Sequence, residues 1–400
     1  MRKSLLFIAW DGPDVNYLEG LFMPIFAGLL DDYDIHIMQF TWGDENKTAL
    51  LHHKCAQLGV HYTREEIYRK PVATAGVIIT LLKGAKSIQK YVAKNNISIL
   101  MPRSTMPAWM VMRAIKYCPQ IRLVFDADGL PLEERVDFAG LKKTGFQYKY
   151  LKSIEQGIIN QADVVLARTQ KAVQYLTVGK AVSASKFFVV VNGRNEEVFK
   201  PAVKMGNPIR KKLGIPDCAL LVVYAGSLGP QYCLGEMIAL FKILQEKKHN
   251  SYLLLLTGSQ QYAANNAQLW AGLEKNVVVA NVPFSEVPLY LSLADAALAF
   301  RRDYFSMAGV APVKLGEYLL SGLPVVLTPN TGDTKKLLQN NNACFLLDTF
   351  SSEAFTAAAD WLAGVHLNSP VAIEARKTGQ ALFSLKAAVA SYKNALNALP

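Results

Sequence analysis

Residues 311–326 read APVKLGEYLLSGLPVV, and this stretch contains a complete helix-to-strand unit. Pro312 favours a helix start, because its fixed φ is already helical and its missing N–H would have no acceptor there. Ser321-Gly322 interrupts the helical pattern, and the apolar residues 323–326 predict a buried strand. Such helix-to-strand units build parallel α/β sheets.

Lys314 and Glu317 are three residues apart, so they share one face of the predicted helix. That face lies at the N-terminal end, where backbone N–H groups and the helix dipole favour an anion. A cation for phosphate beside a carboxylate for sugar hydroxyls is the pair that a nucleotide-sugar site requires. The plain alternative is a salt bridge on a surface helix, and this stretch alone leaves both interpretations open.

Apolar runs of strand length recur along the chain and alternate with segments of helical spacing. They occupy residues 4–9, 34–40, 97–102, 122–127, 163–168 and 187–192, then 219–226, 251–258, 276–282, 295–300, 323–328 and 343–348. Tyr17–Leu30 and Thr80–Lys94 are two of the helical segments between them. The alternation predicts an α/β fold with doubly wound parallel sheets.

A polar, proline-containing stretch, Asn192–Pro216, separates the two series of strands and is interpreted as a linker. We therefore predict Rossmann-like domains at residues 1–192 and 193–372, since 400 residues exceed one ordinary core. Residues 373–400 are predicted to form a C-terminal helix crossing back to the first domain. Ligands in such sheets bind outside the carboxyl ends of the strands, here in a deep cleft between the domains.

The composition limits the classes of protein to which this chain can belong. The chain carries a formal charge of +11, with 51% hydrophobic and 19% charged residues, which excludes a disordered chain. No arginine-rich tract indicates a nucleic-acid binder. Its five cysteines are dispersed without a CxxC pair, which indicates reduced thiols and a cytoplasmic location. The longest apolar stretch, Val72–Leu82, is shorter than the roughly 20 residues of a membrane-spanning helix.

Four blocks, in the expected order, resemble the retaining GT-B glycosyltransferases of family 4, also called glycosyl transferases group 1. They are VVVNGRNEEVFKP (189–201), YAGSLGPQYCLGEMI (224–238), VPFSEVPLYLSLADAALAF (282–300) and APVKLGEYLLSGLPVV (311–326). The resemblance implies two Rossmann-like domains and sugar transfer from a UDP- or GDP-sugar. The acceptor would be a hydroxyl of a glycan or lipid-linked glycan in cell-surface polysaccharide biosynthesis, and no metal or other cofactor would be needed.

The resemblance also implies roles for individual residues of the donor site. Glu317 would bind the ribose hydroxyls, and Lys314 would lie near the diphosphate. The amides of Val313, Lys314 and Leu315 would add donors there. The nucleotide base would lie near Gly258 and Val282. Gly258 follows an apolar run, so it equally fits a simple strand-to-loop turn.

The sequence departs from the family at two places. A second glutamate expected eight residues before Glu317 is replaced by Gly309, whose backbone we expect to contact the donor sugar instead. An arginine and a lysine expected in the turn after residues 219–226 are replaced by Ser227 and Tyr232. Arg301 is our candidate for the missing positive charge, with a solvated loop arginine as the alternative.

In the first domain, Gly12 follows the first apolar run, where the family uses a glycine-containing loop near the donor phosphates. Asp126 and Asp128 follow the run at 122–127, and either carboxylate could orient or accept the proton of the acceptor hydroxyl. A turn closed by an aspartate side chain is the structural alternative for this D-x-D-G sequence. None of the six histidines lies in a pattern typical of zinc or of a catalytic triad.

Two further functions stay open at this stage, a GT-B-fold sugar-nucleotide epimerase and a catalytically inactive glycosyltransferase-like partner protein. The segment 69–94 combines apolar residues with basic flanks. It predicts either peripheral contact with a membrane surface or a core helix with solvated lysines.

Overall fold

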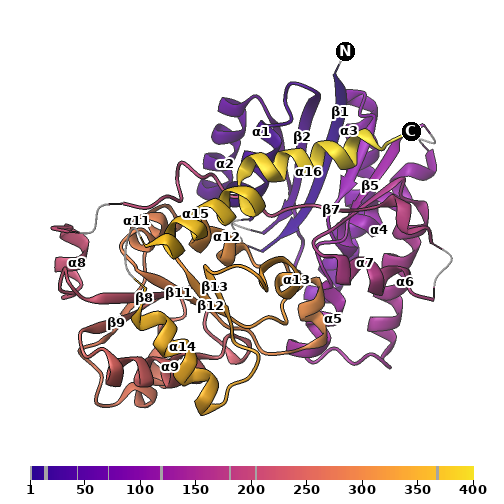
Figure 1. Ribbon diagram of the computed structural model, residues 1–400. Coiled ribbons are helices and arrows are strands. Elements are labelled where there is room, and N and C mark those ends of the chain that lie inside the picture. Colours follow the sequence, from indigo (N-terminus) through magenta and orange to yellow (C-terminus); the bar gives the residue numbers. More distant parts are fainter. Residues whose placement is uncertain are drawn as a thin grey trace. The chain divides into compact units, whose positions relative to one another are not determined.

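The computed structural model describes residues 2–12, 17–42, 44–70, 72–117, 120–179, 182–202, 205–365 and 369–400 (Figure 1). The chain divides into two compact units. The first comprises Met1–Val191, Phe305–Val310 and Ala388–Pro400, and the second comprises Asn192–Tyr304 and Ala311–Ala387.

The first unit contains a parallel seven-stranded sheet in the order β3-β2-β1-β4-β5-β6-β7. Its strands are β1 (Lys3–Asp11), β2 (Tyr33–Thr41), β3 (His61–Glu66), β4 (Ile99–Pro102), β5 (Arg122–Asp126), β6 (Val164–Ala167) and β7 (Phe187–Val189). Its helices and helical turns are η1 (Leu18–Phe22), α1 (Met23–Ala27), α2 (Glu45–Leu58), α3 (Ala73–Asn95), α4 (Thr105–Ala114), η2 (Ile115–Tyr117), α5 (Pro131–Phe138), α6 (Phe146–Gln161), α7 (Gln170–Thr177), η3 (Ala184–Lys186) and η7 (Phe305–Gly309).

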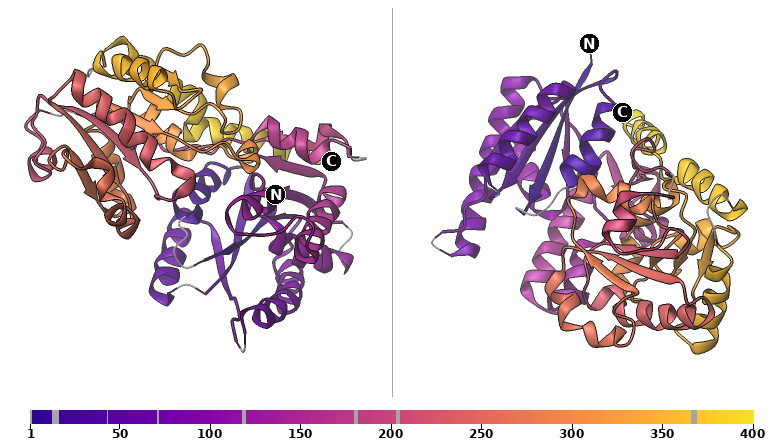
Figure 2. Two further views of the ribbon diagram at one scale, coloured as in Figure 1. Left: turned by 90° about the horizontal axis from the view of Figure 1, so that it is seen from below. Right: turned by 90° about the vertical axis from the view of Figure 1, so that its left-hand side faces the viewer.

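Alternation along β1 shows why both faces of this sheet are covered. Phe7 contacts the tilted ring of Phe22 and meets the ring of Phe26 edge to face, with centroids 4.7 and 5.0 Å away. Leu6 and Ile8 point to the opposite face and join the core beneath α3, α4 and α6. Because successive strand residues face opposite sides, an almost continuous apolar strand requires helices on both sides (Figure 2).

The second unit contains a parallel six-stranded sheet in the order β10-β9-β8-β11-β12-β13. Its strands are β8 (Leu220–Ala225), β9 (Ser251–Leu256), β10 (Val277–Ala280), β11 (Ala296–Ala299), β12 (Val325–Leu327) and β13 (Cys344–Leu346). Its helices and helical turns are α8 (Pro208–Lys212), η4 (Pro230–Tyr232), α9 (Leu234–Lys247), α10 (Gln260–Asn265), η5 (Ala267–Trp270), η6 (Phe284–Glu286), α11 (Val287–Leu291), α12 (Val313–Leu320), α13 (Thr334–Leu338), α14 (Ser352–Ala363) and α15 (Pro370–Phe383). One core layer lies under α9 and α14, and the other lies under α12 and α15.

Two parallel α/β sheets confirm the predicted fold class, and each of the twelve apolar runs contains a strand. One strand, β3, was not predicted, because its sequence HYTREE has no apolar run. It lies at the edge of the sheet, where its residues are mostly half-buried.

The C-terminal segment differs from the single crossing helix predicted for residues 373–400. Ser384 separates α15 from α16 (Leu385–Asn397), and the two helices belong largely to different units. Helix α15 packs on α12 so closely that a Cβ on Gly379 would lie 2.5 Å from the Leu320 nitrogen. Helix α16 packs in the first unit, where its Lys393 forms an ion pair with Asp32 at 2.8 Å.

Candidate functional site

The carboxyl edge of the second unit's sheet carries the predicted donor-site residues. The chain leaves β8 toward β9 and β10 on one side and returns to β11 on the other side of β8. This change of direction is the topological switch point at which open α/β sheets bind ligands. Gly226 and Ser227 follow β8, and Arg301 closely follows β11.

Helix α12 is fixed beside the end of β8. Tyr318 accepts a hydrogen bond from the Ala225 nitrogen at 2.7 Å, and its hydroxyl is 3.2 Å from the Ala225 carbonyl. Gly316 allows α15 to approach, since a Cβ there would lie 2.8 Å from the Phe383 Cβ. These contacts hold the start of α12 at the switch point.

Glu317 is buried, with 1% of its surface exposed. Its Oε1 accepts a hydrogen bond from Arg194 Nε at 2.9 Å. Its Oε2 is buried and has no hydrogen-bond partner among the described residues, while Lys314 Nζ lies 3.9 Å away. An oriented carboxylate with one unsatisfied oxygen is an acceptor ready for a hydroxyl donor.

Lys314 lies over the turn that follows β8. Its Cε would be 3.1 Å from a Cβ placed on Gly226, and Gly226 has a φ of 155°. A side chain at residue 226 would therefore crowd the end of the Lys314 side chain. Since the Lys314 side chain is 40% exposed, its ammonium group stays accessible to an anion.

Arg194 is the principal site residue that the sequence analysis missed. It occupies the linker block NGRN, and its guanidinium lies 5.9 Å from the Phe284 ring centroid. Its backbone N–H donates to the Phe383 carbonyl at 2.9 Å, which anchors it to the end of α15. A buried glutamate requires a cationic partner, but the burial of Glu317 was not predicted from the sequence, so no signal there pointed to Arg194.

The helix start offers fewer amides than predicted. The Leu315 nitrogen donates to the Pro312 carbonyl at 3.1 Å, so this amide is already used. Val313 and Lys314 are the first two residues of α12, whose N–H groups have no acceptor within the helix. Two amides, and not three, therefore fit the predicted anion site.

The two arginines after β11 have different surroundings. Arg302 donates to Glu236 at 2.7 Å and to the Pro230 carbonyl at 3.2 Å, which ties it to the surface of α9. The Arg301 guanidinium lies 4.3 Å from the Tyr232 ring centroid. Burial raises the pKa of Tyr318, whereas the hydrogen bond with the Ala225 backbone and the positive charge of Arg301 oppose that rise.

Gly258 and Val282 follow β9 and β10 at the same edge of the sheet. Gly258 is exposed, and a Cβ there would meet nothing within 4 Å. Val282 is half-buried. The Leu228 nitrogen donates to Ser259 Oγ at 3.1 Å, which joins the turn after β8 to the turn after β9. The space beside Gly258 is compatible with the predicted base-binding position.

The predicted acidic residues of the first unit lie in a charged network. Asp126 is fully buried, and its Oδ2 accepts a bond from Arg168 at 2.7 Å. Its Oδ1 accepts the Asp128 nitrogen at 3.1 Å, which is the aspartate turn given above as the alternative. Asp128 has a left-handed φ of 53° and pairs with Arg103 at 2.6 Å. With its side chain 30% exposed, Asp128 is the more accessible of the two carboxylates.

This network extends to Asp11, the last residue of β1, which the sequence analysis did not single out. Burial raises the pKa of Asp11, while a hydrogen bond from Gln39 and the charge of Arg103 oppose the rise. Burial likewise disfavours the charged form of Arg103, but the neighbouring aspartates outweigh it and raise its pKa. Gly12 follows directly and is half-buried, whereas the rest of its predicted loop, residues 13–16, lies outside the described residues.

Gly309 belongs to the first unit and is not grouped with Lys314 and Glu317. It packs against the D-x-D-G turn, where a Cβ on Gly309 would lie 2.6 Å from the Leu130 nitrogen. The neighbouring Ala308 carbonyl accepts a bond from Thr169 at 2.6 Å. The absence of a glutamate here thus has a steric reason, since no side chain fits.

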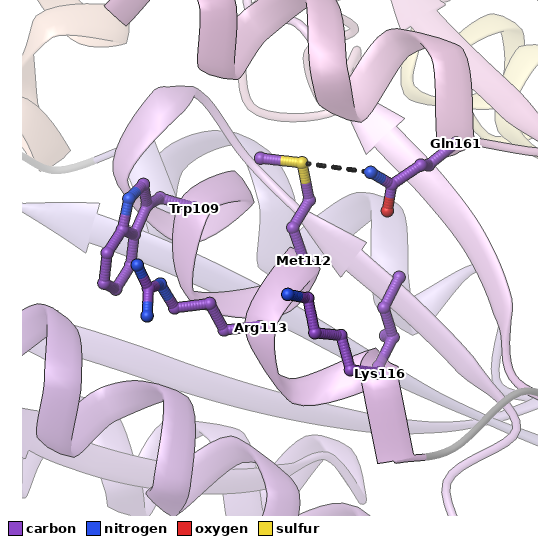
Figure 3. A pocket seen from close by; sticks show the side chains of 6 residues that line it. Trp109, Met112, Arg113, Lys116 and Gln161 are labelled. Atoms are coloured by element: carbon purple, nitrogen blue, oxygen red, sulfur yellow. Dashed lines mark hydrogen bonds between the residues drawn. The ribbon is translucent and has the colours of Figure 1, made fainter. Parts of the chain in front are cut away.

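A separate pocket of about 510 Å³ lies in the first unit (Figure 3). It is lined by Trp109, Met112, Arg113, Ile115, Lys116 and Gln161. Helix α4 runs away from the carboxyl end of β4, and α6 ends just before β6 begins, so this pocket faces the amino edge of the sheet. None of the predicted site residues lines it.

Comparisons with known proteins match part of the chain to one family and the whole chain to one fold. Residues 207–364 match the family described as glycosyl transferases group 1. A sequence comparison with curated proteins finds no match. None of the described helices is long and apolar enough to cross a membrane.

Several solved structures resemble the whole chain. Anabaena HepE in complex with UDP superposes with a TM-score of 0.71, at 16% identity and with 100% of both chains covered. HepE has also been solved with UDP-glucose. A glycosyltransferase from Rickettsia africae gives a TM-score of 0.70 at 18% identity, covering 99% of each chain. Sucrose-phosphate synthase from Thermosynechococcus elongatus gives 0.70 at 14% identity, covering 99% of this chain and 98% of that one.

The matched domain contains the sheet edge from Gly226 to Arg301 and the start of α12. The structural likeness covers both units and shows their common fold. Residues 207–364 match the glycosyl transferases group 1 family, and both units share the fold of the GT-B glycosyltransferases named above. Together, the two findings support a glycosyltransferase.

Proposed function

We propose that the chain is a retaining glycosyltransferase of family 4 that uses a UDP- or GDP-sugar as donor. The observation that carries the proposal is the buried Oε2 of Glu317, which has no hydrogen-bond partner among the described residues and lies 3.9 Å from the accessible ammonium group of Lys314. The carboxylate would accept hydrogen bonds from the ribose, and the cation would balance the diphosphate. That HepE was solved with UDP and UDP-glucose supports the uridine nucleotide as the first choice.

In the proposed reaction, the bond between the anomeric carbon and the diphosphate breaks, and its electron pair stays on the leaving phosphate oxygen. Lys314, Arg301 and the amides of Val313 and Lys314 would stabilise this developing charge. The acceptor oxygen forms the new bond on the same face of the sugar, and the leaving phosphate takes the acceptor proton. Asp128 in the first unit would orient the acceptor hydroxyl, which belongs to a glycan or lipid-linked glycan.

We propose that this transfer needs no metal ion at the donor site. The two cationic side chains and the amides at the start of α12 supply the positive charge that a metal ion would otherwise provide. Transfer rates measured in EDTA should equal those measured with added magnesium or manganese. A rate that vanishes in EDTA and returns with a divalent ion would contradict this part of the proposal.

The proposed setting is cell-surface polysaccharide biosynthesis, with the chain in the cytoplasm and in peripheral contact with the membrane. Helix α3 and the residue preceding it expose Val72, Ile78, Ile79 and Leu82. Lys83, Lys86 and Lys90 are exposed on the same helix. Exposed apolar residues beside lysines favour binding to an anionic lipid surface. Sedimentation with anionic and neutral vesicles tests this, and equal binding to both would contradict it.

A thermal-shift screen of the full chain against UDP, GDP and their sugars tests the central proposal. One nucleotide series should raise the melting temperature by several degrees, because a ligand that binds only the folded state stabilises it. Transfer should then depend on an added glycan acceptor. Isomerised nucleotide sugar without an acceptor would identify an epimerase, and no shift with any nucleotide would identify an inactive relative.

A further inference from the structure

Three potential metal ligands meet at the amino ends of β2 and β3. His36 lies directly opposite His61 in the parallel register of these strands. Asp34 precedes His36 by two residues, so its side chain lies on the same face of the sheet. The register of two neighbouring strands therefore brings two imidazoles and one carboxylate together.

Their geometry approaches that of a metal site. Asp34 lies 3.2 Å from His36 Nε2 through Oδ2 and 3.4 Å from His61 Nε2 through Oδ1. One ligand atom from each residue lies within 4.8 Å of the others. An ion with tetrahedral bonds of about 2.0–2.1 Å holds its ligand atoms about 3.3–3.4 Å apart. Asp34 reaches the two imidazoles through different oxygens and the rings are stacked, so the exposed His61 side chain must turn for one ion to contact all three residues.

The surroundings of His36 suit a side chain that binds a metal ion. Its Nδ1 lies 3.0 Å from the Tyr91 hydroxyl, which also forms a hydrogen bond with Thr63. A hydroxyl can donate or accept, so this bond persists when His36 carries its proton on Nδ1 and leaves Nε2 for a metal.

The cluster is also accessible. The His36 side chain is 5% exposed, whereas the side chains of Asp34 and His61 are 34% and 58% exposed. The two imidazole rings stack with centroids 4.4 Å apart and planes inclined by 19°. One imidazole is therefore buried and oriented, and its two partner side chains are accessible from solvent.

We propose that Asp34, His36 and His61 bind one divalent metal ion of the late first transition row, with zinc as the best fit to two imidazoles and a carboxylate. A water molecule would complete the tetrahedron. Strand β3 pairs only with β2, so the ion would fasten this edge strand to the sheet. The site lies at the amino edge, whereas Asp126 and Asp128 lie at the carboxyl edge of the same sheet, so the proposed role is structural.

The test uses full-length, tag-free protein that has been treated with chelator and dialysed. Titration with zinc chloride alone should show one saturable site, and zinc should raise the melting temperature. Cobalt(II) should give the intense visible absorption of a tetrahedral site. Tyr91→Phe should weaken zinc binding about 10- to 100-fold, because it removes the group that orients His36.

His61→Ala should reduce zinc affinity at least tenfold and abolish the thermal shift, and Asp34→Asn should act similarly. His61 is largely exposed, so this variant is expected to fold, which circular dichroism verifies. His53→Ala is the matched control, since His53 is exposed on α2 outside the cluster. Zinc affinity and thermal shift unchanged in His61→Ala, or the absence of a saturable site in the parent chain, would overturn the proposal.

Discussion

Arg194 and Glu317 form a buried ion pair, in which Arg194 Nε donates to Glu317 Oε1 at 2.9 Å. Arg194 follows the start of the second unit, and Glu317 lies on α12, so the pair joins distant parts of one unit. It orients the carboxylate while leaving Oε2 without a hydrogen-bond partner among the described residues. Arg194 therefore positions Glu317, and the accessible Lys314 is left to meet the donor.

Replacing Arg194 should harm folding more than replacing Lys314. Arg194→Met leaves a buried carboxylate uncompensated, which costs about 3–5 kcal/mol of unfolding free energy. Lys314→Met removes a partly exposed charge and should change stability by about 1 kcal/mol or less. Urea unfolding and nucleotide titration measure the two effects. Equal losses of stability, or unchanged nucleotide affinity in Lys314→Met, would contradict these assignments.

Replacing Asp126 should mainly lower the stability of the protein, whereas replacing Asp128 should mainly lower its catalytic rate. Asp126→Asn breaks the buried pair with Arg168 and should destabilise the protein by about 3–5 kcal/mol. Asp128→Asn affects a more exposed side chain and should mainly slow transfer. Denaturant titration and acceptor-dependent turnover are the readouts. A stable Asp126→Asn variant, or full turnover in Asp128→Asn, would refute this division.

Most of the fold could be predicted from the sequence, because buried parallel strands leave continuous apolar runs. Strand β3 could not be predicted, because an edge strand needs few apolar residues and its sequence HYTREE contains no apolar run. The break at Ser384 also escaped prediction. At this break the backbone of Ser384 pairs with that of Arg194, which lies far away in the sequence.

The residues of the candidate site could be predicted only where they lie close together in one short segment of the sequence. Lys314 and Glu317 lie one turn apart on α12, so their proximity follows from helix geometry. The roles of Arg194 and Gly226 depend on contacts between separate segments, which the sequence does not reveal. The steric reason for Gly309 likewise requires the position of Leu130.

Glu133 provides a test by pH. Burial alone would raise the pKa of Glu133, but hydrogen bonds from Tyr175 and Tyr148 and the charge of Lys152 outweigh it and lower that pKa. A carboxylate with a lowered pKa stabilises the folded state above its unfolded pKa, and this contribution is lost as the pH falls through the folded pKa. Glu133→Gln should therefore destabilise the protein at pH 7, with a smaller difference from the parent chain below about pH 4. Urea unfolding at both pH values measures it, and a difference that grows on acidification would be the opposite result.

Glycine substitutions test the steric account of residue 309. Gly309→Ala would place a Cβ against backbone atoms of Leu130 and should cost about 1–3 kcal/mol of stability. Gly258→Ala is the matched control, because a Cβ there meets nothing within 4 Å. Thermal melting distinguishes them. A Gly309→Ala variant as stable as the parent chain would show that the turn at Gly129 moves easily.

The most direct measurement of the central claim is calorimetric titration of the parent chain and Glu317→Gln with UDP and GDP. Glutamine keeps an oxygen for Arg194 but lacks the charge that strengthens hydrogen bonds to ribose hydroxyls. The account predicts that the parent chain binds one of these nucleotides. The folded variant should lose about 2–4 kcal/mol of binding free energy, roughly 30- to 700-fold in Kd. Equal affinity of the two proteins for that nucleotide, or no binding to the parent chain, would contradict it.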